Sequence, residues 1–372
     1  MTKEIEENLR KQLNKFKNKY DVILGMSGGV DSTYSLMQFL DKKKKVLGIY
    51  LDLFEDDKKT SDENAKKAQK LANKFNVDFL VIHEKEYFKE KVQEYFAKTY
   101  LEGKTPNPCS ICNRDVKMAI LFEISNILNV KHIATGHYAG IAKFNDHLVI
   151  KKGKEPRKEQ SYFLALIDKE FLKKIIFPMQ DVEDKEKIRE KLIKQNIMDL
   201  ESSSDSQDIC FIQNGKHIEF VEKYLKEKET DKKNANIYLP NGKIINGKHI
   251  FSYTIGQRKG IGVSYDKPLY VKDIIKNENN NGKDKIVLDT KENMYEEFVY
   301  IEDINLFIPE KEIPENIKVK LRYSKTEIDA KIKFINKDLA KIIFEKKQIK
   351  GAKGQIAAIY FENLLLGGGI IK

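Results

Sequence analysis

The sequence is poor in cysteine and has no long apolar run near its start. Only three cysteines occur in 372 residues, an odd count that argues against a disulfide framework and favours metal or catalytic chemistry. Residues 1–22 form a charged amphipathic stretch without the apolar core of a signal peptide or a membrane anchor. We therefore expect a cytoplasmic protein that does not associate with membranes.

Charge and length bound the class of protein. Lys and Arg outnumber Asp and Glu by 68 to 57, which gives a formal net charge of +11. A polyanionic partner would explain this excess, and lysine-rich solvated faces would explain it equally well. With 41% apolar residues, a chain of this length can bury two or three separate cores.

Apolar runs and helical patterns alternate over the first half of the chain, which predicts a parallel sheet wrapped by helices. Strands are predicted at residues 20–25, 46–51, 77–82 and 131–138, and helical spacing at 32–43, 61–75 and 116–128. After short strands and turns between residues 144 and 163, two more helices are predicted over 169–176 and 182–195.

The pattern changes to β-hairpins beyond about residue 205. Asn241-Gly242 and Asn246-Gly247 are predicted turns of a small β-rich unit, and the segments after the polar stretch 276–282 alternate like strands of a compact barrel. We expect an α/β domain over residues 1–205, a central β-rich domain over 206–283 and a C-terminal β barrel over 284–372.

A glycine-bearing loop, residues 27–32 with the sequence SGGVDS, follows the first predicted strand. Glycines between a strand and a helix let backbone N–H groups approach a phosphate, and the helix dipole favours the anion. The loop has neither the Gly-Lys-Ser/Thr ending of a Walker loop nor the Gly-x-Gly-x-x-Gly order of a dinucleotide site. It resembles the signature of the ATP pyrophosphatases, which cleave ATP between the α and β phosphates and act on many substrates. Ser27 and Ser32 could bind phosphate, and Asp31 could hold Mg²⁺.

The three cysteines lie in two motifs. Cys109 and Cys112 form a C-x-x-C pair in the proline-held segment TPNPCSICN, residues 105–113, ahead of a predicted helix whose N-terminus favours thiolates. Cys210 lies much further on, in SQDICFI, where it could simply be part of a core. The pair alone indicates metal or sulfur chemistry without distinguishing them.

Six motifs occur in one order along nearly the whole chain: GMSGGVDS, TPNPCSICN, ATGHY, EQSYFL, SQDICFI and YTIGQRKGIG. This order resembles that of the tRNA-specific 2-thiouridylases of the MnmA/TrmU type. The resemblance implies an ATP-dependent transferase that binds tRNA, 2-thiolates its wobble uridine, and receives sulfur from a cysteine desulfurase or a sulfur relay protein. It also implies the three-domain fold predicted above.

The resemblance assigns roles residue by residue. Cys112 matches the catalytic nucleophile and Cys210 the persulfide-carrying cysteine, while Asn107, Pro108 and Cys109 would face the target base. The ATP site would be lined by Gly25, Met26, Ser27, Gly28, Gly29, Val30, Asp31, Ser32, Leu51 and Gly136. The positions that match tRNA contacts are His137, Lys158, Glu159, Gln160, Arg322, Tyr323 and Gln355. A structural histidine, a solvated turn and a strand surface are the plainer readings of His137, of residues 158–160 and of residues 322–323.

Two departures from the family pattern matter. Many relatives have Asp where this chain has Glu159, which is a conservative change, and many have Asp in place of Cys109. In a persulfide route Cys210 carries the sulfur, Cys112 acts on it, and Cys109 is a bystander. In the route that we favour from the sequence, Cys109, Cys112 and Cys210 bind three irons of a [4Fe–4S] cluster whose fourth iron holds sulfide. Zinc on these cysteines and His137 would block the thiols that the reaction needs.

Two other functions remain open at this stage. A different ATP pyrophosphatase, acting on RNA or amidating a small carboxylate, would not need three placed cysteines. An RNA-binding or sulfur-carrier protein that has lost catalysis would not need the intact phosphate loop. We further expect that the segments carrying Cys109 and Cys210 rearrange when tRNA binds.

Overall fold

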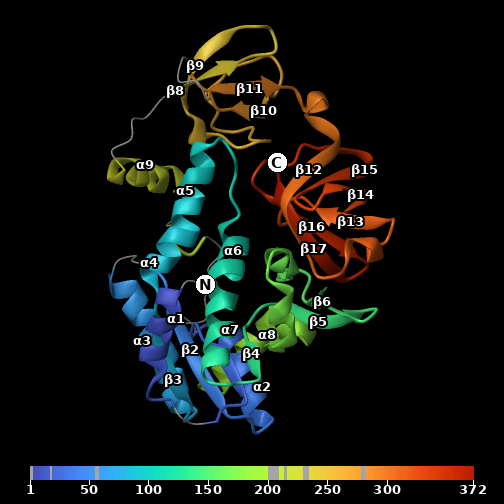
Figure 1. Cartoon of the computed structure of the whole chain (residues 1–372). Helices are drawn as coiled ribbons and strands as arrows, with labels where there is room; N and C mark the ends of the chain where they lie inside the picture. Colours follow the sequence, from blue (N-terminus) through green and yellow to red (C-terminus); the bar gives the residue numbers. More distant parts are fainter. Residues whose placement is uncertain are drawn as a thin grey trace.

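The described part of the chain builds three β-sheets. A computed structural model describes residues 3–16, 19–54, 58–199, 209–212, 216–228, 234–277 and 282–372. Figure 1 shows a five-stranded sheet with its helices at the bottom, a four-stranded sheet at the top and an eight-stranded sheet on the right. Within these ranges no helix has the length and apolar character needed to span a membrane.

The five-stranded sheet is parallel throughout, with the order β3-β2-β1-β4-β7. Its strands are β1 (Val22–Gly25), β2 (Val46–Asp52), β3 (Asp78–His83), β4 (His132–Ala134) and β7 (Ile175–Ile176). The predicted α/β fold of the first part of the chain is thereby confirmed. In such a sheet all the carboxyl ends of the strands lie at one edge, where ligands bind.

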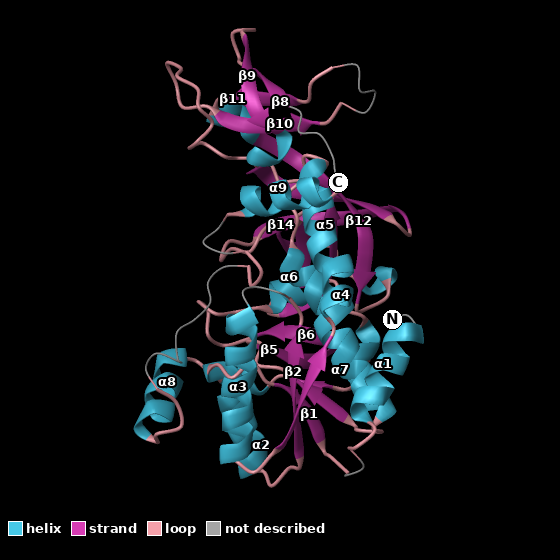
Figure 2. Ribbon diagram, turned by 90° about the vertical axis from the view of Figure 1, so that its left-hand side faces the viewer, coloured by secondary structure: helices cyan, strands magenta, loops and turns pink. Residues whose placement is uncertain are grey.

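Helices cover both faces of this sheet, as Figure 2 shows from the side. Helices α2 (Val30–Asp41) and α3 (Lys58–Lys74) pack on one face, while α7 (Met118–Ile127) packs on the other and is itself covered by α1 (Lys3–Leu13). The side chains of β1 alternate accordingly: Val22 and Leu24 belong to the core under α2, and Ile23 to the core under α7. Burial on both faces explains why the strands are apolar runs.

The predicted helix over residues 169–176 is wrong in its second half. Residues Lys169–Lys173 form a short 3₁₀ helix, and Ile175 and Ile176 then pair with β4 as the edge strand of the sheet. Two consecutive isoleucines fit a strand better than a helix because their branched side chains restrict χ1. The helix predicted over 182–195 is confirmed as α8 (Lys185–Lys194).

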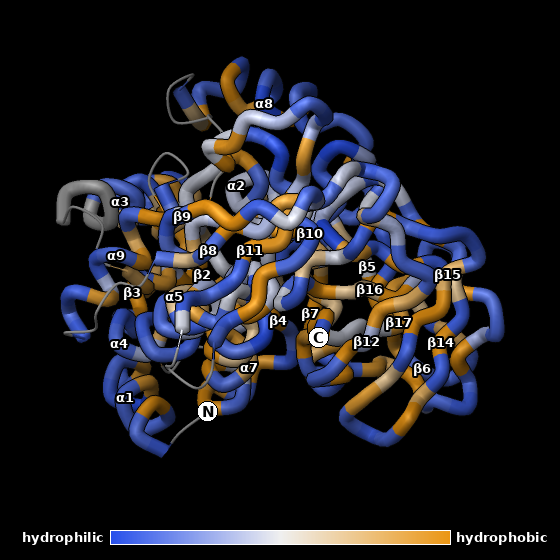
Figure 3. Tube along the Cα trace, turned by 90° about the horizontal axis from the view of Figure 1, so that it is seen from above, coloured by the Kyte–Doolittle hydropathy of each residue, from blue (hydrophilic) through white to orange (hydrophobic). Residues whose placement is uncertain are grey.

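The eight-stranded sheet contains a closed six-stranded barrel, which confirms the predicted C-terminal barrel. Pairing of β12 with both β15 and β17 closes the barrel. Figure 3 shows β16 and β17 running mainly through apolar residues, in keeping with their burial. The barrel strands are β12 (Tyr295–Leu306), β13 (Ile317–Lys320), β14 (Ile328–Asn336), β15 (Leu339–Ile349), β16 (Ile356–Phe361) and β17 (Leu364–Ile371).

A hairpin from the first half of the chain extends this barrel sheet. Strands β5 (Ala139–Phe144) and β6 (His147–Lys152) follow β4 in sequence but leave the parallel sheet. β6 pairs with Leu364 and Leu365 at the beginning of β17, whereas the remainder of β17, from Gly367, pairs with β12. One strand therefore joins the hairpin to the barrel.

The central unit is a four-stranded sheet of order β10-β11-β8-β9, formed by β8 (Asn234–Tyr238), β9 (Ile244–His249), β10 (Tyr270–Ile275) and β11 (Lys285–Asp289). The turn at Asn241-Gly242 is confirmed, with Gly242 at φ 82°. The turn at Asn246-Gly247 is wrong, because both residues lie inside β9 next to a register shift. Helix α9 (His217–Glu227) was not expected. The predicted boundary at 205/206 falls outside the described residues and stays a prediction.

Candidate active site

The phosphate loop joins the end of β1 to the beginning of α2. Gly28 adopts φ +77°, and a Cβ there would lie 3.0 Å from the backbone nitrogen of Ala68, so the position requires glycine. The hydroxyls of Ser32 and Thr33 both donate to the carbonyl of Gly29, at 3.1 and 2.9 Å. These bonds fix the first turn of α2, whose N-terminal N–H groups are the natural phosphate donors.

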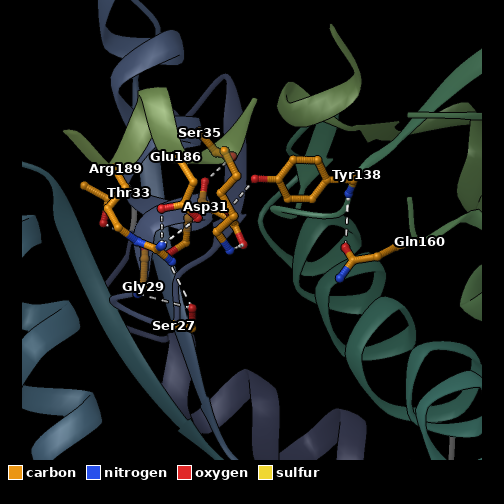
Figure 4. Close-up of polar contacts among 11 residues, drawn as sticks. Ser27, Gly29, Asp31, Thr33, Ser35, Tyr138, Gln160, Glu186 and Arg189 are labelled. Atoms are coloured by element: carbon orange, nitrogen blue, oxygen red, sulfur yellow. Dashed lines mark hydrogen bonds and ion pairs between the residues drawn. The ribbon is translucent and has the colours of Figure 1, made fainter. Parts of the chain in front are cut away.

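Asp31 is held between two side chains from other elements, as Figure 4 shows for Tyr138. The Tyr138 hydroxyl donates to Oδ1 at 2.8 Å, and the buried ammonium of Lys185, the first residue of α8, donates to Oδ2 at 2.7 Å. Gly136 passes so close that a Cβ would lie 3.0 Å from the Cβ of Asp31. The negative charge of Asp31 is therefore already balanced within the loop region.

A cavity of about 480 Å³ opens at the carboxyl ends of the parallel strands. Its lining includes seven of the residues predicted for ATP: Gly25, Met26, Ser27, Asp31, Ser32, Leu51 and Gly136. It also includes His137, Gln160 and Cys210 from the other predicted sets. Gly28, Gly29 and Val30 belong to the same loop without lining the cavity, and Val30 is buried. Motifs that are far apart in sequence thus meet around one space.

The cysteine loop leads into a continuous helix beside this cavity. It consists of α6 (Pro108–Ile111), a π-helical segment η2 (Cys112–Lys117) and α7. Asn107 caps α6 by accepting a hydrogen bond from the backbone of Ser110, 3.1 Å away. Cys112 is buried, whereas Cys109 and Cys210 are exposed.

The thiols of this loop are less acidic than the sequence suggests. Burial raises the pKa of Cys112 to about 12, against the opposing effect of the positive charge of Lys117. Desolvation by the surrounding protein also raises the pKa of Cys109, although part of that residue reaches solvent, and Lys117 again opposes the shift. The lowered thiol pKa values expected from the helix N-terminus are therefore not found, and the largest cause of the raised values is desolvation of the thiolates.

Two of the residues predicted to contact tRNA hold other segments of the protein in place. Gln355 donates to the carbonyls of Thr105 and Pro106, at 3.2 and 2.9 Å, and so fastens the cysteine loop to the barrel. Glu159 is buried in an ion pair with Lys320, 3.1 Å away, so the reading of this position as a solvated turn is wrong.

The other predicted contact residues lie at or near the surface. Arg322 and Tyr323 are exposed on the barrel, and the Tyr323 ring lies 4.6 Å from that of Phe163. Lys158 is half-buried. Gln160 accepts a hydrogen bond from the backbone of Tyr138 at 3.1 Å while lining the cavity. These residues therefore range from the lining of the cavity, for Gln160, to the exposed surface of the barrel, for Arg322 and Tyr323.

Relatives with nearly the same length resemble this chain throughout. The tRNA-specific 2-thiouridylase MnmA of Clostridioides difficile is 35% identical over 96% of this chain and 99% of its own length. The tRNA-specific 2-thiouridylase MnmA 2 of Clostridium botulinum is 36% identical over 94% and 98%, and the MnmA 1 of Clostridium tetani 35% identical over 96% and 98%. The chain belongs to the tRNA-specific 2-thiouridylase family.

Family models divide this 2-thiouridylase family member into three parts. Residues 20–214 match the tRNA methyl transferase HUP domain, residues 218–281 the tRNA methyl transferase PRC-barrel domain, and residues 296–371 the Aminomethyltransferase beta-barrel domain. These descriptions name methyl transfer, whereas the relatives that match almost the whole chain are named for thiolation, and the latter agree with the cysteine motifs. As a member of this family the protein is an enzyme, and it belongs to the tRNA sulfurtransferases.

One solved structure resembles this chain more distantly. The U34-tRNA thiolase NcsA from Methanococcus maripaludis with its [4Fe-4S] cluster is 19% identical, with a TM-score of 0.33, over 61% of this chain and 73% of that one. A likeness this low says nothing about a cofactor here. The cofactor question therefore depends on the residues of this family member itself.

Those residues provide the chemistry of a cluster but not its arrangement. Three cysteines are the ligands that an iron–sulfur cluster takes. Across the described ranges, however, no three His, Cys, Asp or Glu side chains are grouped so that they could hold a metal ion. Cys109, Cys112 and Cys210 would have to move closer to one another before they could bind a cluster.

Three residues near the site were missed in the sequence. Tyr138 and Lys185 bind Asp31, and Lys117 lines the cavity. Tyr138 stands in the ATGHY motif, which could have drawn attention to it. Lys117 follows Cys112 by five positions, a spacing that places two residues on different faces of an α-helix and so gave no signal.

His137 is expected to make the protein sensitive to acid. Burial lowers its pKa to about 3, with a further contribution from Lys117, whereas an unfolded histidine titrates near ~6.5. Between these values only the unfolded chain binds the proton, so the stabilising contribution of neutral His137 is complete above pH ~6.5 and is lost as the pH falls toward 3.

Urea unfolding at pH 7.5 and pH 5 measures this effect. The unfolding midpoint of the wild type is expected to fall with pH, and that of a His137→Gln variant to fall less. A His249→Gln variant, changed in the central unit, serves as the control and keeps the wild-type loss. Equal losses in all three proteins would show that His137 is not the group responsible.

Proposed function

We propose that this protein is a tRNA-uridine 2-sulfurtransferase that consumes ATP and modifies the wobble uridine. The uridine C2 oxygen attacks the α phosphate and pyrophosphate leaves; sulfur then attacks C2, and AMP departs with the former C2 oxygen. The observation that carries the proposal is the single cavity whose lining includes the phosphate loop and Cys210. The products are 2-thiouridine, AMP and pyrophosphate, and we place the reaction in the cytoplasm.

The phosphate side of this cavity suits ATP. Its volume of 480 Å³ lies within the range of about 300–1,000 Å³ usual for small-molecule sites. Gly25 to Ser32 would surround the phosphates, with Leu51 and Gly136 completing the site. Mg²⁺ would neutralise the departing pyrophosphate, and Asp31 would hold it by exchanging its contact with Lys185 for the metal.

The opposite side would receive the base. A wobble uridine must leave the anticodon stack to reach the α phosphate. Asn107 and Pro108 would face the flipped base, and His137 and Gln160 lie in the cavity lining beside it. Arg322, Tyr323 and Lys158 would contact the tRNA outside the cavity, while Glu159 and Gln355 would act indirectly by fixing the segments that carry the site.

Sulfur delivery would involve the cysteines next to the base. Cys210 is exposed and lines the cavity, as a residue that receives sulfur from an upstream donor protein must be. Cys112 is buried, and it lies close enough to Cys210 for the charges of the two sulfurs to interact. Cys109 decides between the routes, because a cluster needs it as a ligand and a persulfide does not.

Reconstitution tests the proposed function directly. Purified protein with ATP, Mg²⁺ and a tRNA transcript, supplied with sulfide in one reaction and with a cysteine desulfurase and cysteine in another, is expected to release pyrophosphate only when tRNA is present. Mass analysis of the tRNA is expected to find 2-thiouridine in at least one of the two reactions. Release without tRNA would indicate a different ATP pyrophosphatase. Binding of tRNA without any release would indicate a protein that has lost catalysis.

Iron analysis separates the two sulfur routes. Protein purified without oxygen is assayed for iron and acid-labile sulfide and then for thiolation. Full thiolation by colourless, iron-free protein would exclude the cluster. Activity that rises with iron and labile sulfide content would exclude a route in which Cys109 is a bystander.

A further inference from the structure

Lys117 brings a positive charge to the lining of the cavity. It lines the same space as Ser27, Gly136 and Cys210. Among the described residues no carboxylate forms an ion pair with its ammonium, whereas the other charged residue of the lining, Asp31, is already neutralised by Lys185 at 2.7 Å. A polyanionic nucleotide in this cavity would therefore meet Lys117 as the one lining cation among the residues that the structure describes.

The π-helical segment η2 places this charge next to the sulfur chemistry. In an α-helix, residues five positions apart point about 140° away from each other. The i→i+5 bonding of a π-helix widens the turn, so that Lys117 follows Cys112 on the same side. The positive charge of Lys117 acts on the Cys112 thiol, and Cys109 and Cys210 are also close enough for their charges to act on the lysine.

We propose that Lys117 is a catalytic residue whose ammonium binds the α phosphate of the adenylated uridine and offsets the charge that AMP gains on leaving. This inference rests on the proposed function. A sulfur lone pair forms the S–C2 bond, the electron pair of the C2–O bond moves onto the oxygen, and AMP departs with one additional negative charge. Lys117 donates hydrogen bonds without giving up its proton, because the neighbouring Cys112 raises the pKa of this ammonium above the ordinary value for lysine.

The position of Lys117 selects this step over the first one. The phosphate loop and the N-terminus of α2 supply donors for the triphosphate and the departing pyrophosphate. Lys117 instead lies where the lining of the phosphate side meets the cysteines, so its charge acts where the incoming sulfur and the outgoing AMP oxygen share one carbon. A fixed cation at such a point stabilises the transition state more than the bound substrates.

Single-turnover assays of Lys117→Met and Lys117→Arg test the inference. Lys117→Met is expected to lower thiolation by roughly 10²–10³-fold but tRNA-dependent pyrophosphate release by much less, so that adenylated tRNA accumulates. Lys117→Arg is expected to recover at least tenfold in thiolation because it restores the charge. Lys131→Met, which changes an exposed lysine just before β4, is the control and keeps both activities.

The outcomes are distinct. Thiolation by Lys117→Met within twofold of the wild type would overturn the inference, as would equal losses of both steps together with a lowered melting temperature in both Lys117 variants. If the wild type itself releases no pyrophosphate with tRNA, the proposed function fails independently of Lys117.

Discussion

Replacing Cys112 by alanine is expected to abolish thiolation while tRNA-dependent pyrophosphate release continues. Cys112 is buried in the helical segment that brings Lys117 to the cavity, and it is not part of the phosphate loop, so its loss removes sulfur transfer without removing adenylation. Loss of a nucleophile commonly costs roughly 10³-fold or more. The measurement is a parallel assay of pyrophosphate and of 2-thiouridine by mass spectrometry.

Two further alanine variants complete this comparison. Cys210→Ala is expected to behave like Cys112→Ala under both sulfur routes. Cys109→Ala, three residues before Cys112, keeps wild-type thiolation if a persulfide carries the sulfur and loses it if a cluster does. A Cys112→Ala enzyme that thiolates tRNA at the wild-type rate would remove this residue from the reaction.

Replacing Lys320 by methionine is expected to cause the largest loss of stability. Lys320 and Glu159 are 6% and 9% exposed and lie 3.1 Å apart, joining the barrel to the EQSYFL motif. Removing one partner of a buried ion pair leaves a buried charge and typically costs about 3–5 kcal/mol. The free energy of unfolding in urea, followed by circular dichroism, measures this loss.

The same strand offers a matched control. Lys318 lies two residues before Lys320 on β13 and pairs with Asp329 on an exposed surface, 2.7 Å away, so Lys318→Met is expected to cost less than about 1 kcal/mol. Changing Lys320 and Glu159 to methionine together is expected to recover most of the loss. Similar effects of the Lys318 and Lys320 variants would mean that the buried pair does not stabilise the fold.

The sequence predicts the parts of this fold that depend on local patterns. The strands around Ile23 and Leu47 are apolar runs between helical segments, and this alternation is sufficient to predict a parallel sheet. It does not predict that the hairpin of residues 139–152 leaves this sheet for the barrel. Its partner, Leu364, lies more than two hundred residues away, and no local pattern records such a pairing.

The candidate site likewise has features that local sequence predicts and features that depend on long-range packing. The phosphate loop is predictable because its glycines meet a local backbone requirement, seen in the positive φ of Gly28. The pairing of Glu159 with Lys320 and of Gln355 with the cysteine loop depends on how distant segments pack. Lys117 was missed for a different reason, since the π-helical segment changes which residues share a face.

Because β17 pairs with both the hairpin and the barrel, it determines how these two parts unfold locally. One edge of β17 pairs with β16, while its other edge is hydrogen-bonded to β6 through its first residues and to β12 through its later ones. Separation of this strand therefore breaks the pairings with β6 and β12 together, in addition to the one with β16. Amides in β6, β12 and β17 are therefore expected to exchange hydrogen as one cooperative unit. Transient opening would then release the hairpin and the barrel together, and a partly open molecule with only one of these pairings broken would be rarely populated.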